Sequence, residues 1–365
     1  MRCTLLSTTL LLTLLTLLLT GCSDNSQQGI EENPTPPSFG SAVDPALLTN
    51  AGYSETLRKY YNCLVAENHM KWAIVQPAEG NFSFTEADKI VNFARTYGMK
   101  MRGHALLWHL QVPDWVTAKP AADLDTVLKT HIDTVVGRYK GEIFAWDVAN
   151  EIIMCADTGL RNRTLSASDP DYSPWSLNAS DDSMIRKAFI YAHAADPEAR
   201  LFLNDNNNYD GGELVYPGWN KLQSDLLYSF IRKWKEDGIP IHGVGMQLHL
   251  VEGYPPDYSL IEADIIRYGN LGLEIHFTEV DVRIKEPVTP QKLQNQAAIY
   301  RELARLAAKH PRTVRAFITW GLTDKHSWIP LFFTGFGHAL PFDENYDPKE
   351  CYQAIKETIA VPYRP

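Results

Sequence analysis

Short apolar runs alternate with longer amphipathic stretches along the chain from residue 38 onward. A strand covered by helices on both faces reads as a nearly continuous apolar run, whereas a surface helix repeats its apolar residues every three or four positions. Eight short apolar runs occur, at residues 39–43, 61–68, 100–108, 143–151, 200–205, 243–250, 273–281 and 314–321. The pattern therefore predicts eight strands of a parallel sheet.

The stretches between these runs predict helices. In residues 85–98, the apolar residues Ala87, Ile90 and Ala94 share one face, and Gly98 can end the helix. Two further stretches begin with a capping residue and end at a proline, namely residues 180–197 and 289–311. Strand and helix thus alternate regularly along the chain.

This alternation, without a change in composition, predicts an α/β fold, a (β/α)8 TIM barrel that forms a single catalytic domain over residues 38–361. An open doubly wound sheet is the alternative, but the Gly-rich phosphate-binding sequence of that fold does not follow the first run. The content of 45% hydrophobic residues is sufficient for one large core.

The first 37 residues differ from the rest. Met1 and Arg2 precede a Leu/Thr-rich run that ends in LTGC, a sequence that resembles the bacterial lipobox. We therefore expect a lipoprotein signal peptide at residues 1–21, a lipidated Cys22, and a flexible polar linker at residues 22–37. The expected location is the bacterial cell envelope, at the outer membrane or cell surface; an ordinary signal peptide with an incidental cysteine is the alternative.

Composition restricts the partners. The net charge of -10 and the lack of a basic block argue against nucleic acid, and outside the N-terminal run no stretch is apolar enough to span a bilayer, so a membrane is a partner only through the lipid. We expect a monomer. Cys63, Cys155 and Cys351 remain once Cys3 is removed and Cys22 is lipidated, so we expect no essential disulfide and buried thiols instead.

Polar residues stand at the ends of most of the apolar runs. Because parallel barrel strands end at one face, these side chains should converge there, where barrel enzymes have their active sites. The residues concerned are Glu67 and Asn68, His104, Asn150 and Glu151, Asn204 and Asp205, Gln247 and His249, Glu279 and Asp281, and Trp320.

Two of these residues suit acid and nucleophile chemistry. Glu151 ends the fourth run and Glu279 lies in the seventh, which suggests a general acid and a nucleophile on different strands. The acid would keep a proton near neutral pH while the nucleophile stays ionised. We expect about 5 Å between the two carboxyl groups, the separation that permits direct attack on a glycoside.

Spacing suggests how Glu279 is supported. Glu279 and Asp281 are two residues apart on one strand and point the same way, as do Gln247 and His249 on the neighbouring strand. Asp281 could therefore fix the tautomer of His249 while the other ring nitrogen donates to Glu279. A metal site is the alternative for such a mixture, but neither HExxH nor paired CxxC spacing occurs.

Tryptophans follow two of the strands. Indole faces suit the apolar faces of sugar rings, and nearby polar groups can bind ring hydroxyls, so the combination favours a carbohydrate substrate. The tryptophans are Trp108, Trp115, Trp320 and Trp328, and the polar candidates are Asn68, Lys71, His104, Gln111, Asn150 and, at the end of the fifth run, Asn204.

Together these motifs resemble glycoside hydrolase family 10, the barrel endo-β-1,4-xylanases. The matching pieces run in order from about residue 38 to 360: AENHMKW, RGHALLWHLQVPDW, WDVANE, LFLND, GVGMQLH, FTEVD, TWGLTDKHSWIP and ALPFDENYDPKECYQAI. The resemblance implies hydrolysis of xylan or xylo-oligosaccharides with retention, with Glu279 as nucleophile and Glu151 as general acid/base. It implies no cofactor and no metal.

The resemblance also implies subsites. Asn150 would lie by the sugar 2-hydroxyl, and Asn68 and Gln111 would contact the next sugar towards the non-reducing end. The subsite at the cleaved bond would be lined by Lys71, His104, Gln247, Trp320 and Trp328.

The sequence departs from the family pattern in three places. Asn206 stands where the family commonly has Tyr, and residues 156–182 form a long loop after the acid, so we expect an altered leaving-group side. SWIPLFFTGFGHALPFD adds aromatics after the last strand, which suggests altered subsites or tolerance of side-chain decorations on xylan.

Two alternatives to a xylanase remain at this point. The enzyme could act on a β-1,4-glucan instead, which rates on xylan and carboxymethylcellulose would distinguish. The chain could also be a surface glycan-binding lipoprotein without activity, although retention of both Glu151 and Glu279 argues against a mere binder.

Overall fold

The computed structural model describes residues 35–154, 159–206 and 221–361. The predicted signal peptide, Cys22, most of the predicted linker and Cys155 lie outside these ranges. Cys63 and Cys351 are buried free thiols, as expected.

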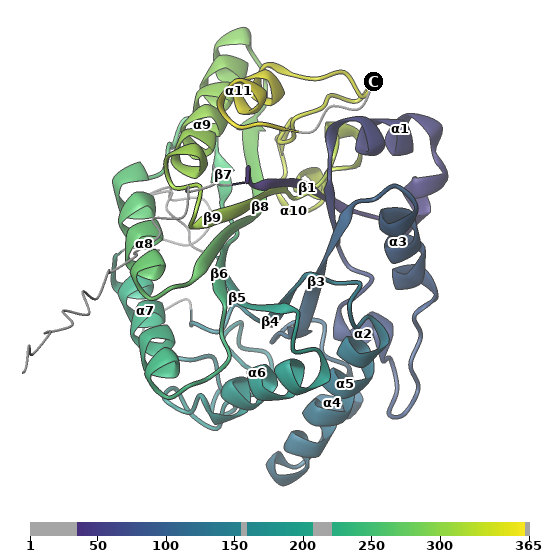
Figure 1. Cartoon of the computed structure of the whole chain (residues 1–365), viewed down its shortest axis with the longest axis vertical. Helices are drawn as coiled ribbons and strands as arrows, with labels where there is room; N and C mark the ends of the chain where they lie inside the picture. Colours follow the sequence, from purple (N-terminus) through teal and green to yellow (C-terminus); the bar gives the residue numbers. More distant parts are fainter. Residues whose placement is uncertain (1–34, 155–158, 207–220, 362–365) are drawn as a thin grey trace, which may run out of the picture. The chain divides into compact units, whose positions relative to one another are not determined.

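Within the described ranges, eight parallel strands close into a barrel, which confirms the predicted fold (Figure 1). The first strand pairs with both the second and the last, and this pairing closes the ring. The barrel strands are β1 (Ser38–Val43), β2 (Cys63–Ala66), β3 (Lys100–Leu107), β4 (Ala145–Asn150), β5 (Arg200–Asp205), β6 (Gly243–Met246), β8 (Glu274–Lys285) and β9 (Val314–Thr319).

Helices surround the barrel and bury their apolar faces against it (Figure 1). The three predicted helices are present: one ends before Gly98, and Thr289 caps another by accepting a hydrogen bond from the Lys292 N–H. The longer helices are α1 (Ala51–Tyr60), α3 (Thr85–Thr96), α5 (Leu124–Arg138), α6 (Ser183–Ala195), α7 (Lys221–Glu236), α8 (Tyr258–Asn270), α9 (Pro290–Lys309) and α11 (Glu350–Thr358).

Short elements lie in the loops between strands and helices. They are α2 (Trp72–Val75), α4 (Asp114–Thr117), α10 (Ile329–Phe332), the 3-10 turns η1 (Pro45–Thr49), η2 (Ala121–Asp123) and η3 (Asp324–His326), and the two-residue strand β10 (Phe336–Gly337). None of the helices in the described part of the chain is both long and apolar enough to cross a bilayer.

The sixth predicted strand is divided in two. After β6, Leu248 takes a positive φ of 62°, and the chain resumes as β7 (His249–Val251), which pairs with β8. The prediction of one strand over residues 243–250 is therefore wrong. Gln247 lies at this break but still bonds to both adjacent strands through its backbone. Its N–H donates to the Asp205 carbonyl at 3.2 Å, and its carbonyl accepts from the Glu279 N–H at 3.1 Å.

The barrel interior below the polar strand ends is itself partly charged. Asp147, which is fully buried, forms an ion pair with Arg102 and a 2.9 Å contact with Nδ1 of His104. The side chain of Asn204 packs directly against Gly245 on β6, where a Cβ would lie 2.1 Å from the Asn204 Oδ1. A bulkier residue at 245 would displace Asn204, whose side chain contacts the strand-end carboxylate Glu279.

Candidate active site

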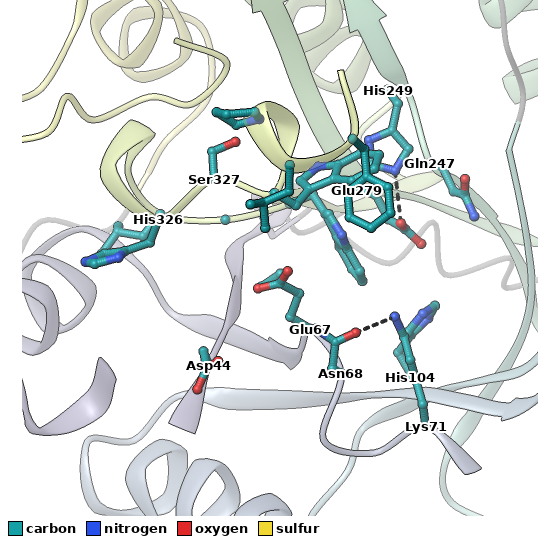
Figure 2. Close-up of a pocket in the computed structure, with 18 of the residues that line it drawn as sticks. Asp44, Glu67, Asn68, Lys71, His104, Gln247, His249, Glu279, His326 and Ser327 are labelled. Carbon is teal, nitrogen blue, oxygen red and sulfur yellow. Dashed lines mark hydrogen bonds and ion pairs between the residues drawn. The ribbon is translucent and has the colours of Figure 1, made fainter. Parts of the chain in front are cut away.

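A cavity of about 960 Å³ opens at the face where the barrel strands end. Most of the predicted site residues line it, among them both carboxylates, and Figure 2 shows several of them pointing inward. The predicted residues that line it are Asn68, Lys71, His104, Trp108, Gln111, Asn150, Glu151, Gln247, His249, Glu279, Trp320 and Trp328. The separation of about 5 Å between the two carboxyl groups stays a prediction.

Glu279 lies on β8 and accepts a hydrogen bond on each carboxylate oxygen. Asn204 Nδ2 donates to Oε1 at 2.8 Å, and His249 Nε2 donates to Oε2 at 3.1 Å. Burial alone would raise the pKa of Glu279, but the hydrogen bond from His249, the charges of His104 and His249, and the bond from Asn204 lower this pKa to about 2. Glu279 is therefore ionised at neutral pH.

His249 carries a positive charge between two carboxylates. Its Nδ1 lies 2.8 Å from Oδ2 of Asp281, which also accepts from Trp328 Nε1 at 2.9 Å. Burial opposes protonation, but the charge and hydrogen bonds of Asp281 and Glu279 raise the pKa of His249 to about 10. The predicted Asp281–His249–Glu279 arrangement is confirmed, with both ring nitrogens acting as donors.

Glu151 follows β4 and takes a positive φ of 54°. Its half-buried carboxylate accepts from Trp108 Nε1 at 2.8 Å on Oε2 and from Gln247 Nε2 at 3.0 Å on Oε1. Trp108 directly follows β3, the neighbour of β4 on one side, and Gln247 directly follows β6, two strands away on the other side, so groups from both directions around the barrel orient the side chain.

An amide network joins the surroundings of the two carboxylates. Asn204 Nδ2 donates to Asn150 Oδ1 at 2.7 Å as well as to Glu279, and its own Oδ1 accepts from Thr278 Oγ1 at 2.7 Å. Gln247 Nε2 also lies 3.3 Å from Asn150 Oδ1. Asn204 is fully buried and does not line the cavity. Its prediction as a substrate-binding residue is therefore wrong, because protein groups occupy both ends of its amide.

Lys71 lies between two of the predicted tryptophan walls. Its Nζ is 4.9 Å from the ring centre of Trp108 and 5.9 Å from that of Trp320, and it donates to Asn68 Oδ1 at 2.9 Å. Burial lowers the pKa of Lys71, while the charges of Glu279, Glu67 and Glu151 oppose this. Trp115 does not line the cavity but packs against the core and donates to Gln76 O at 3.4 Å, so its assignment as a wall is wrong.

Three carboxylates in the cavity were not among the predicted site residues: Asp44, Glu67 and Asp324. Glu67 points into the cavity beside Asn68 (Figure 2). Burial raises its pKa to about 7, with Lys71 opposing and Asp44 and Glu279 adding to the rise. Glu67 had been noted as a strand-end residue, and Asp44, which directly follows β1, obeys the same rule. If every polar residue directly after a strand had been taken as a site candidate, Glu67 and Asp44 would both have been predicted.

The loop after the acid is described from residue 159 onward. It folds back onto the site, since Arg161 Nε donates to the Glu151 carbonyl at 3.0 Å and Trp175 Nε1 donates to the Trp108 carbonyl at 2.7 Å. Asn206, which replaces the usual Tyr, lines the cavity. Among the residues that the structure describes, no group of three or more His, Cys, Asp or Glu side chains could hold a metal ion.

Replacing Asp281 with Asn should lower the pKa of His249 from about 10 by at least one unit, because the charge that stabilises the imidazolium is removed. A raised histidine pKa stabilises the fold below the unfolded-state value and loses this effect as pH rises through the folded-state value, so the variant should also be less stable at pH 7. NMR titration of the ring measures the shift. His310, which is paired with Glu262 elsewhere, is the internal control. An unchanged His249 titration would contradict the assignment.

Comparisons with known proteins agree with this geometry. Residues 31–358 match the model of "Glycosyl hydrolase family 10". The chain is 35% identical over 330 residues to a "Beta-1,4-xylanase" of Dictyoglomus thermophilum, covering 87% of each protein. It is 37% identical to "Endo-1,4-beta-xylanase A" of Thermoanaerobacterium saccharolyticum, of which it spans only 28%.

Solved structures give the same result. The crystal structure of xylanase 10B from Thermotoga petrophila RKU-1 in complex with xylobiose is 36% identical, with a TM-score of 0.79 over 88% of this chain and 94% of that one. The barrel, the site and these comparisons lead to one conclusion: this chain belongs to glycosyl hydrolase family 10.

Proposed function

We propose how this family 10 endo-1,4-β-xylanase cleaves xylan: Glu279 is the nucleophile and Glu151 is the general acid/base of a retaining reaction. One observation carries the assignment. Hydrogen bonds from His249 and Asn204 keep Glu279 ionised. The carboxylate of Glu151 lies in the same cavity, and its donors Trp108 and Gln247 are both uncharged.

The reaction takes two displacements. In the first, a carboxylate oxygen of Glu279 bonds to the anomeric carbon as the glycosidic bond breaks, and Glu151 gives its proton to the leaving oxygen. In the second, Glu151 takes a proton from water, the water oxygen bonds to the anomeric carbon, and Glu279 leaves as a carboxylate. The configuration at the anomeric carbon is inverted twice and so retained.

The remaining cavity residues bind and orient the sugars in this proposal. Asn150 lies by the 2-hydroxyl of the sugar that is attacked. Trp320, Trp328, Lys71, His104 and Gln247 surround that sugar, and Asn68 and Gln111 hold the next one, with Trp108 between them. Their position around the two carboxylates supports these roles.

An apolar lip extends the cavity. Leu331 and Phe332 of α10 line it although they are 83% and 72% exposed, and the Phe332 ring lies 5.4 Å from that of Trp328. Exposed apolar residues grouped at a binding site usually contact a ligand. We propose that this lip contacts substituents on the xylan main chain.

The anchoring of the enzyme is also a proposal. The LTGC sequence supports a lipid on Cys22 that holds the catalytic domain at the bacterial cell envelope, on the outer membrane or cell surface. Action as a monomer stays a prediction from the sequence.

Replacing Glu279 with Gln should lower xylan turnover at least about a thousandfold, because an amide oxygen is a poor nucleophile, while xylohexaose binding stays nearly intact. Release of reducing ends and calorimetry measure the two quantities. Glu274→Gln, on the same strand but paired with Arg200 away from the cavity, is the matched control. Full activity of the Glu279 variant would remove this residue from the mechanism.

Replacing Leu331 and Phe332 together with Ala should lower the ratio of kcat/KM on arabinose-decorated xylan to that on linear xylan by about threefold or more, since about 1 kcal/mol of apolar contact is lost only for the decorated chain. Leu177→Ala, at another exposed leucine outside the cavity, should leave the ratio unchanged. An equal ratio in the double variant and the parent enzyme speaks against the lip as a contact for substituents.

Replacing Cys22 with Ser should abolish incorporation of labelled palmitate and release the enzyme from the membrane fraction, since lipidation needs the thiol. Cys3→Ser, within the same expected signal peptide, should still be labelled. Labelling that survives in the Cys22 variant would refute the anchor.

A further inference from the structure

Asp205 is a buried carboxylate beside Glu151 that the mechanism above does not use. It ends β5 and is 2% exposed. Its Oδ2 accepts from the Ile152 N–H at 3.1 Å, and its Oδ1 accepts from the Asn206 N–H at 2.8 Å. Asp205 is not among the described residues that line the cavity, so any effect on the substrate must pass through a neighbour.

The neighbour is Glu151, whose backbone is held on several sides. Its positive φ of 54° is unfavourable for a residue with a side chain, so surrounding bonds must maintain it. The Glu151 N–H donates to Asn204 O at 2.9 Å, and its carbonyl accepts from Arg161 Nε at 3.0 Å. The bond from Ile152 to Asp205 fixes the peptide that follows. Asp205 thus holds one end of a strained residue.

We propose that Asp205 is a positioning residue for Glu151, which fixes the peptide that follows the acid and thereby the direction of the Glu151 carboxyl. This inference rests on the proposed role of Glu151 as general acid/base.

The electrostatics agree with the geometry. Burial raises the pKa of Asp205 to about 7, and the charge of Glu151 adds to the rise, while Arg161 and the two backbone N–H groups oppose it. Arg161 comes from the loop after the acid, and the phenol of Tyr268 on α8 also interacts with Asp205. Because two nearby carboxylates repel each other, the charge of Glu151 hinders ionisation of Asp205. Asp205 therefore keeps its proton up to about pH 7, and its role towards Glu151 is to hold the backbone.

Asp205→Ala tests the positioning. It removes the acceptor of the Ile152 N–H, so kcat/KM for phenyl β-xylobioside, whose leaving group needs a proton from Glu151, should fall about tenfold or more at every pH. With 2,4-dinitrophenyl β-xylobioside, whose leaving group departs without a proton, kcat/KM should stay within about twofold. Asp205→Asn keeps an oxygen for the Ile152 N–H and should recover most of the loss.

Asp196→Ala is the matched control. Asp196 is 1% exposed and also accepts two backbone N–H bonds, from Gly141 and Glu198, but it follows α6, before β5 begins. This variant should leave kcat/KM for both substrates unchanged. Thermal unfolding adds a second readout: a carboxyl pKa that folding raises from 3.8 to about 7 costs stability as pH rises between these two values, so Asp205→Asn should gain stability relative to the parent from about pH 4 to about pH 7.

Parent kcat/KM of Asp205→Ala on phenyl β-xylobioside, or an equal loss on the two aryl xylobiosides, would overturn the role of Asp205. Glu151→Gln separates this failure from failure of the proposed function. If Glu151→Gln hydrolyses phenyl β-xylobioside at the parent rate, the assignment of the acid is wrong. If it loses this activity while Asp205→Ala keeps the parent rate, only the inference about Asp205 fails.

Discussion

The hydrogen bonds that His249 and Asn204 donate to Glu279 are the interaction on which the rest of the site depends. They keep a buried carboxylate charged, which an apolar interior would otherwise prevent. One donor comes from β7, which pairs with β8, the other comes from β5, which lies beyond β6, and Glu279 itself comes from β8. The nucleophile therefore requires the register of adjacent barrel strands to be correct, and this requirement links the fold directly to the chemistry.

The two catalytic candidates differ because their neighbours differ. Glu279 faces the positively charged ring of His249, and that charge is secured by Asp281. Glu151 receives neutral donors, an indole and an amide, and has the buried carboxylate of Asp205 behind it. Identical functional groups are thus given different tasks by the residues around them, as is usual where one site must supply both a proton and a nucleophile.

The barrel and much of the site could be predicted from the sequence because both follow from short-range regularities. Apolar runs mark strands, and residues two apart on one strand share a face, which was sufficient to place Glu279 and Asp281 together, facing the segment that carries His249. Asn204 could not be assigned correctly, since its role depends on which partners its amide meets in three dimensions. The break at Leu248 was missed for a similar reason, because an apolar residue with positive φ leaves no mark in a hydrophobic pattern.

The loop over residues 159–182 has a consequence for how this enzyme can change. Arg161 holds the carbonyl of Glu151 and Trp175 holds that of Trp108, the residue whose indole reaches the Glu151 carboxylate. A surface loop therefore holds the backbone of the proton donor Glu151 and that of its neighbour Trp108. Shortening this segment would remove both contacts in this enzyme, so here the length of a surface loop and the direction of the acid are coupled.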